Sequence, residues 1–227
     1  MYGITFLTWL SVFCVSDTFL TRTELQGVYY LIHAAHNGLI VYSTYSDVWR
    51  TFAEFNSIGK VVPNYYAAEL VFALHIYHCI YYWRKFRMDD WLHHILMIAI
   101  ALPIGISLHS GTLLGFSLFF TTGLPGGIDY MLLFLTRNDW LSRDFEKRVN
   151  SQLAAWIRMP GCVAQAALTV AFLSTQNNQV GFITILAYLS AALNYWNGVY
   201  FGYQVIFDAG TRGIRERQGP ANLLVQV

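Results

Sequence analysis

Long apolar stretches separated by short polar segments dominate this chain of 227 residues. A bilayer core about 30 Å thick is crossed by roughly 20 residues of α-helix, so each apolar stretch of about that length with few charges predicts a membrane-spanning helix. Seven stretches fit, the first of them short, at residues 2–15, 25–45, 65–83, 92–108, 112–135, 154–173 and 180–207. We therefore expect an all-α, polytopic membrane bundle of about seven transmembrane helices.

The composition excludes several other classes of protein. Charged residues make up only 12% of the chain, against about 25% in a typical soluble domain, and 56% of the residues are hydrophobic. This leaves too little polar surface for a soluble or a disordered chain. The net charge of +1 gives no overall attraction for a polyanion, so we expect no nucleic-acid partner. The three cysteines lie far apart in apolar stretches without CxxC spacing, which favours packing roles.

Lysine and arginine divide unevenly between alternate loops. With seven spans, twelve of the fourteen fall on the side that holds the C-terminus, and the other side has only Arg50 and Lys60. Because cytoplasmic loops collect positive charge, we expect the N-terminus outside or in a lumen and the C-terminus on the cytoplasmic or organelle-matrix side. Both the endoplasmic reticulum and an organelle inner membrane fit such a protein.

Three polar or broken segments interrupt the apolar pattern. Residues 137–152 predict either a short amphipathic helix at the membrane interface or an ordinary solvated connector. Residues 208–227, with three arginines, three glycines and a proline, are expected to be irregular. The Gly-Leu-Pro-Gly-Gly run at 123–127 should interrupt its helix and face protein, either as part of a binding site or as a kink that lets another helix approach.

Ionisable side chains at membrane depth are costly, so each is a candidate functional residue. Spacing of i, i+3 places the first two histidines on one helical face and the next two on another. Their open roles are metal ligand, general base and hydrogen bond between helices. We favour hydrogen bonding for four of them, and we assign no metal site. The seven histidines are His33, His36, His75, His78, His93, His94 and His109, and the four are His36, His75, His78 and His109.

Two carboxylates also fall inside predicted spans. Glu69 lies in the third stretch and Asp129 in the fifth, where an unpaired charge would be expensive, so we expect each to be protonated or partnered. Asp90 lies just before the His-His pair, and its carboxylate is a candidate for fixing the tautomer of His93 or His94.

The order of four short motifs resembles the TLC-domain family. These are Ile-His-Ala-Ala-His at 32–36, Asn-Tyr-Tyr-Ala-Ala-Glu-Leu at 64–70, Asp-Asp-Trp-Leu-His-His-Ile at 89–95 and Leu-Asn-Tyr-Trp-Asn-Gly at 193–198. The family includes ceramide synthases, translocon-associated TRAM proteins and small TLC-domain proteins, which this chain resembles in length. The resemblance implies three parts: an added helix and loop at 1–24, a six-helix TLC-like domain at 25–207 and a tail at 208–227.

The resemblance also implies a function in the membrane. A lipid or acyl chain would be handled in a lipid-sized cavity, with its head facing polar side chains. If the chain is an enzyme, the resemblance implies acyl transfer from a thioester to an amine or hydroxyl, with His93 or His94 as base and Asp90 as orienter. The side chains expected around the head are His33, Glu69, Asp129, Asn194 and Trp196.

One departure from the family keeps the activity open. Ceramide synthases carry a His-Asp pair one helix after the His-His pair, where this chain reads Phe-Thr-Thr-Gly-Leu-Pro at 120–125. The alternative is a non-catalytic accessory subunit of a larger membrane complex. We expect membrane lipids, and in the alternative other membrane subunits, as partners. We expect no resident cofactor, with acyl-CoA or phospholipid entering only as a bound ligand.

Overall fold

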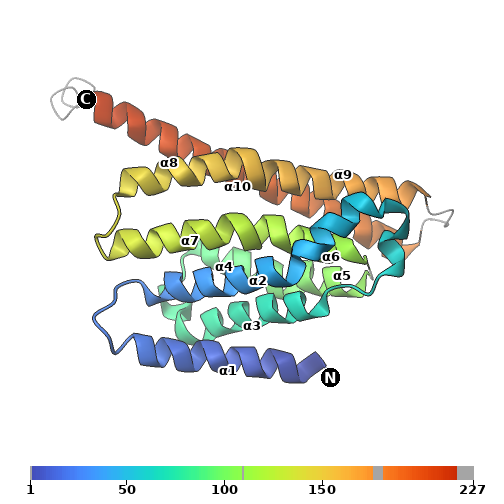
Figure 1. Cartoon of the computed structure of the whole chain (residues 1–227), viewed down its shortest axis with the longest axis horizontal. Helices are drawn as coiled ribbons and strands as arrows, with labels where there is room; N and C mark the ends of the chain where they lie inside the picture. The colour runs from blue at the N-terminus through green and yellow to red at the C-terminus, as the bar shows by residue number, and fades with distance from the viewer. Residues whose placement is uncertain (1, 109, 176–180, 219–227) are drawn as a thin grey trace.

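The computed structural model describes residues 2–108, 110–175 and 181–218, and every regular element in that part is a helix (Figure 1). The expectation of an all-α bundle is confirmed. Several elements run on without a break, so the described chain forms seven rods that go back and forth. In chain order they are α1 (Tyr2–Leu20), α2 (Val28–Ala53) with the 3-10 helix η1 (Phe55–Lys60), α3 (Tyr65–Tyr81) with the 3-10 helix η2 (Trp83–Lys85), α4–η3–α5 (Met88–Ile95, Leu96–Ala101, Leu102–Ser107), α6–η4–α7 (Thr112–Leu118, Phe119–Gly123, Leu124–Arg137), α8–η5–α9 (Arg143–Leu153, Ala154–Arg158, Met159–Thr175) and α10 (Phe182–Gln218).

Three of these rods are long and apolar enough to cross a membrane: Met88–Ser107, Thr112–Arg137 and Arg143–Thr175. A shorter apolar helix covers Ile4–Leu20. Helix α2 is long enough to cross a membrane but is less apolar than these rods. It contains polar side chains such as His36 and Asn37, which are buried against neighbouring helices. These features support an integral membrane protein, and the number of seven spans stays a prediction.

Alternate loops meet at one end of the bundle, at the left of Figure 1. We call it the basic end; it holds residues 21–27, 82–87 and 138–142 and the last turns of α10. The first and third of these segments are joined by hydrogen bonds from the Gln26 N–H to Asn138 Oδ1 (3.0 Å) and from Asn138 Nδ2 to the Gln26 carbonyl (2.9 Å). These segments contain seven of the fourteen lysine and arginine residues, and Arg137 and Arg143 flank residues 138–142.

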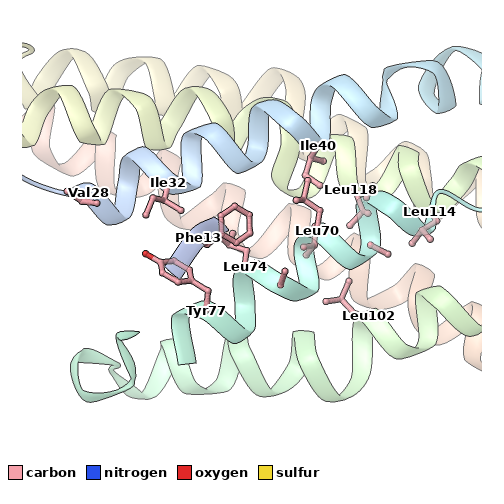
Figure 2. Close-up of a cluster of buried hydrophobic side chains, with 14 residues drawn as sticks. Phe13, Val28, Ile32, Ile40, Leu70, Leu74, Tyr77, Leu102, Leu114 and Leu118 are labelled. Atoms are coloured by element: carbon pink, nitrogen blue, oxygen red, sulfur yellow. The ribbon is translucent and has the colours of Figure 1, made fainter. Parts of the chain in front are cut away.

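The apolar core lies between α1, α2, α3, α5 and α6 (Figure 2). Ile40 of α2, Leu70 and Tyr77 of α3 and Phe13 of α1 are buried in it. Helix α2 is the central element, since it packs against α1, α3, α6 and α7. Burial of both its apolar and its polar side chains therefore fixes how the surrounding helices are placed.

The Gly-Leu-Pro-Gly-Gly segment does not interrupt its helix, contrary to the prediction. The π-helical turn η4 immediately precedes α7, and Pro125 stands in the first turn of α7. A widened turn accommodates a proline ring, which would clash with the carbonyl four residues earlier in a regular α-helix. A Cβ on Gly126 would lie 2.8 Å from Asn37 Nδ2, and one on Gly127 would lie 3.3 Å from Asn37 Cβ. The close approach of another helix, one of the two expected roles, is confirmed.

Two other segments are more helical than expected. A helix, one of the two alternatives for residues 137–152, is present as α8 (Arg143–Leu153), but it continues through η5 into α9 and is not a separate short helix. Residues 208–218 belong to α10, whereas an irregular tail was expected, and residues 219–227 lie outside the described part. Lys147 pairs with Asp208 at 3.0 Å, and Arg212 pairs with Asp144 at 2.7 Å. These pairs between α8 and α10 give the charged residues partners within helices, which the polar composition alone did not indicate.

A buried carboxylate on α1 forms hydrogen bonds with two tyrosines at the end of α3. Asp17 is 2% exposed and accepts hydrogen bonds from the hydroxyls of Tyr77 and Tyr82. Asp17→Ala leaves both hydroxyls without their acceptor, and since an unsatisfied buried donor costs about 1–3 kcal/mol, we expect the free energy of unfolding to fall by about 2–4 kcal/mol. Denaturant unfolding in detergent measures this change. The double variant with Tyr77→Phe should lose less than the sum of the two single variants, and strict additivity would contradict the contact.

Candidate functional site

Five histidines from three helices meet near the basic end. They are His33 on α2, His75 and His78 on α3, and His93 and His94 on α4. The ring centroids of His75, His93 and His94 lie 5.3–5.4 Å from one another. His33 stacks on His78 with a centroid distance of 4.2 Å and an interplanar angle of 14°. We call these five residues the histidine cluster.

Local helix geometry fixes three of the rings. The Nδ1 atom of His33 lies 2.9 Å from the carbonyl oxygen of Tyr29, that of His75 lies 2.8 Å from Val71, and that of His94 lies 2.7 Å from Asp90. In each case the acceptor is four residues earlier, where a helical side chain reaches back over the preceding turn. A carbonyl only accepts, so the hydrogen of each neutral ring is on Nδ1 and the lone pair is on Nε2.

The remaining two histidines pair with these fixed rings. His75 Nε2 lies 3.3 Å from His93 Nε2, and His94 Nε2 lies 3.3 Å from His78 Nδ1. Because His75 and His94 offer lone pairs there, His93 donates from Nε2 and His78 donates from Nδ1. The lone pair of His93 is therefore on Nδ1, and that of His78 is on Nε2, which is buried without a hydrogen-bond partner among the described residues.

Access distinguishes His93 from the other members of the cluster. His33, His75, His78 and His94 are buried, whereas His93 is exposed. Aromatic rings close the sides of the cluster: Tyr130 of α7 lies 4.1 Å from His33, Tyr29 of α2 lies 4.9 Å from His78, and Phe86 lies 4.4 Å from His94, measured between ring centroids. A molecule entering from outside would therefore meet the His93 ring first.

Charged side chains adjoin the cluster through Tyr130. Asp129 precedes Tyr130 on α7 and lies against Glu146 of α8. Glu146 is 0% exposed, and neither of its carboxyl oxygens has a hydrogen-bond partner among the described residues. Helices α7 and α8 thus bring two acidic side chains together near the cluster. The charge of Arg158, on η5, acts on both Asp129 and Tyr130.

The structure brings together three of the predicted residues and separates the others. His33, His93 and His94 belong to the histidine cluster, and Asp129 lies beside it. Glu69 lies against Thr5 and Phe6 of α1, six residues or about 9 Å of helix before His75. Asn194 donates to Gln165 Oε1 at 2.6 Å and to Ser117 Oγ at 3.2 Å, which links three helices. Trp196 is exposed and stacks on Tyr200, outside the cluster.

Asp90 contacts the histidine cluster through its backbone carbonyl and not through its carboxylate. Its carboxylate accepts the backbone N–H of Arg87 at 2.9 Å and caps the start of α4, and the atom that meets His94 is its carbonyl oxygen. Of the remaining histidines, His36 faces Asn37 Oδ1 at 2.8 Å, and His109 lies outside the described residues. This contact lies within α2, and His36 Nε2 is buried without a hydrogen-bond partner among the described residues, so a hydrogen bond between helices stays a prediction for His36.

Several residues of the site escaped the sequence reasoning. Arg158 was counted with the basic loops, although it is a cation inside the apolar run 154–173 and could have been singled out for that reason. Tyr29 and Tyr130 carried no signal, because tyrosines are common throughout the chain. Glu146 stands in a polar segment, where a solvated carboxylate was the natural expectation, and the structure buries it.

Two further features bear on ligand binding: the absence of a metal-binding group among the described residues and the position of a hollow. Within residues 2–108, 110–175 and 181–218, no group of three or more His, Cys, Asp or Glu side chains is placed to hold a metal ion. A hollow of about 460 Å³ lies along one face of α8 and η5, lined mainly by apolar side chains, and is distinct from the histidine cluster. Its lining residues are Phe145, Arg148, Val149, Gln152, Leu153, Trp156 and Ile157.

Comparisons of the chain with models of protein families, with curated proteins and with solved structures found no match. Function must therefore be inferred from the site and from the sequence motifs.

Proposed function

We propose that this chain is a multi-pass membrane protein of the TLC type that handles a lipid or acyl chain and presents the reacting end of that molecule to the histidine cluster. The three apolar rods support the membrane location. The motif segments 32–36 and 89–95, separate in sequence, contribute His33, His93 and His94 to one cluster, which supports the resemblance. In this proposal all seven rods cross the membrane, and the basic end faces the cytoplasm or an organelle matrix.

The contact between His75 and His93 carries the proposal. His93 is exposed, with its lone pair on Nδ1, and its Nε2–H is directed at the lone pair of a buried imidazole 3.3 Å away. When Nδ1 takes up a proton, the new positive charge is stabilised by that hydrogen bond, because charge-assisted hydrogen bonds are stronger than neutral ones. His75 is itself fixed by the Val71 carbonyl. This is the arrangement of a general base with an orienting partner.

The reaction that suits this base is acyl transfer from a thioester. His93 Nδ1 removes the proton from the hydroxyl or amine of an acceptor as the acceptor oxygen or nitrogen attacks the thioester carbonyl. The carbon–sulfur bond then breaks, and the leaving thiolate takes the proton from His93. The products are an ester or amide and a free thiol, so the reaction needs no oxidant or metal. The acyl chain lies against the apolar helices while this happens.

Purification from the native membrane in mild detergent tests the proposal. We expect a monomer or small oligomer that carries bound lipid and that transfers a radiolabelled oleoyl group from an oleoyl thioester to a long-chain amine or alcohol. Native mass spectrometry and lipid extraction measure the first property, and thin-layer chromatography measures the second. Migration in a stoichiometric assembly of many subunits, without lipid or transfer, would instead identify an accessory subunit.

A further inference from the structure

Arg158 has an unusual environment for a cation in an apolar rod. It ends η5, inside the candidate span Arg143–Thr175. Its Nη2 donates to Asn197 Oδ1 at 2.9 Å, and its guanidinium lies 5.7 Å from the centroid of the Phe201 ring, both on α10. Its Nε is buried and has no hydrogen-bond partner among the described residues. The side chain is thus held in place by neutral groups, with donors unused.

No carboxylate lies within ion-pair distance of Arg158 in the described part of the chain. The ion pairs found there join Arg87 to Asp89, Lys147 to Asp208 and Arg212 to Asp144. Asp129 lies beyond ion-pair distance from Arg158 and is close to Glu146. The charge of Lys147 also acts on Asp129. A charge at membrane depth without a close partner is costly, and such charges commonly mark a ligand site.

Arg158 ends η5, which packs against α7, and its charge extends to the proposed base. It acts on the His93 imidazole and on the Tyr130 hydroxyl, which come from α4 and α7. A guanidinium offers planar, paired N–H groups that match the two oxygens of a carboxylate or phosphate. Arg158 therefore combines a buried Nε–H without a partner, a charge without an ion pair among the described residues and an electrostatic influence that reaches His93.

We propose that Arg158 binds an oxyanion on the head of the lipid that the cluster handles, so that the substrate class is an anionic amphiphile with a carboxylate or phosphate head. This inference rests on the proposed function and narrows it. The oxyanion supplies the counter-charge, Asn197 and Phe201 orient the guanidinium, and the apolar chain of the amphiphile extends along the helices. The bound anion fixes the distance between the head and His93.

Binding of matched amphiphiles to the full chain in nanodiscs tests the inference. The probes are oleate, oleyl phosphate and uncharged oleyl alcohol, which share one chain. A hydrogen bond to a charged group contributes about 1.5–3 kcal/mol, so we expect the wild type to bind both anions about tenfold or more tightly than the alcohol. Arg158→Gln should bring this ratio close to one, and Arg158→Lys should keep part of it. Arg22→Gln, at an exposed position between α1 and α2, is the matched control and should leave the ratio unchanged.

The ratio of anion affinity to alcohol affinity in the wild type tests the inference even if the Arg158 variants do not fold. Equal binding of the three probes, with intact acyl transfer, would overturn the anion site and leave the proposed function standing. No binding of any probe and no transfer would remove both. If inorganic phosphate displaces oleyl phosphate, the site is open to free anions. If inorganic phosphate does not displace tightly bound oleyl phosphate, the site recognises the anion as part of a lipid.

Discussion

His93→Gln is expected to lower the rate of oleoyl transfer by about 10²–10⁴-fold, the range that a positioned general base contributes. Glutamine can still place an N–H near His75, so the contact that holds α4 to α3 is retained, while the Nδ1 lone pair is lost. The variant should therefore fold and bind lipid as the wild type does, with the loss confined to the rate of the chemical step. Rates at saturating thioester, together with lipid content after purification, measure the two effects separately.

The control is Leu92→Ala, an exposed neighbour on the same helix that should leave transfer unchanged. Chemical modification gives a readout independent of the reaction: diethyl pyrocarbonate should modify His93 well before the buried members of the cluster. Peptide mass mapping identifies the modified ring. Retention of wild-type transfer in His93→Gln would exclude His93 as the base.

Gly111→Ala is expected to reduce the free energy of unfolding by about 3 kcal/mol or more, which is the second large effect. Gly111 has φ +57° and ψ −130°, a conformation that costs an L-residue about 1–2 kcal/mol or more. A Cβ there would lie 1.7 Å from the carbonyl oxygen of Ile58, which is backbone and cannot rotate away. The overlap adds about 1–3 kcal/mol, the usual cost of overpacking. Thermal unfolding in detergent and the yield of folded protein measure the loss.

Gly38→Ala is the matched control for this substitution. A Cβ on Gly38 meets nothing within 4 Å, and the residue lies inside helix α2. Alanine should stabilise that helix by about 0.5–1 kcal/mol. If Gly111→Ala and Gly38→Ala unfolded at the same temperature, the close approach of residue 111 to the η1 segment would be wrong.

The helices could be predicted from the sequence better than their ends. Apolar runs located all seven rods, because burial in lipid or protein needs continuous apolar surface. The same signal stopped short at residues 143–152 and 208–218, where charged side chains interrupt the run although they are compatible with helix. Ser142, whose side chain accepts the Phe145 N–H at 3.3 Å, is a helix-start signal that hydropathy does not register.

The candidate site was predicted in part for a geometric reason. Spacing of i, i+3 identifies residues that share a helical face, so the histidines could be grouped. Spacing does not give the depth at which neighbouring helices align, which is why Asn194 of α10 is expected with His33, whereas the structure places it against Gln165 and Ser117. Tautomers also depend on tertiary contacts: the roles of His75 and His93 follow from a 3.3 Å contact between residues eighteen positions apart.

Three rods contain a π-helical turn, at η3, η4 and η5. Each such turn holds one more residue than a regular α-helical turn, and one residue corresponds to a rotation of about 100°. The side chains after each π-helical turn therefore face directions that differ by about 100° from those that an uninterrupted α-helix would give them. In the rod from 112 to 137, Gly115 faces Asp47 on one side of the turn, and Gly126 faces Asn37 on the other. Deleting one residue from η4 would restore a regular helix but turn one of these contact faces away from α2, so the extra residue makes both faces compatible with a single neighbour.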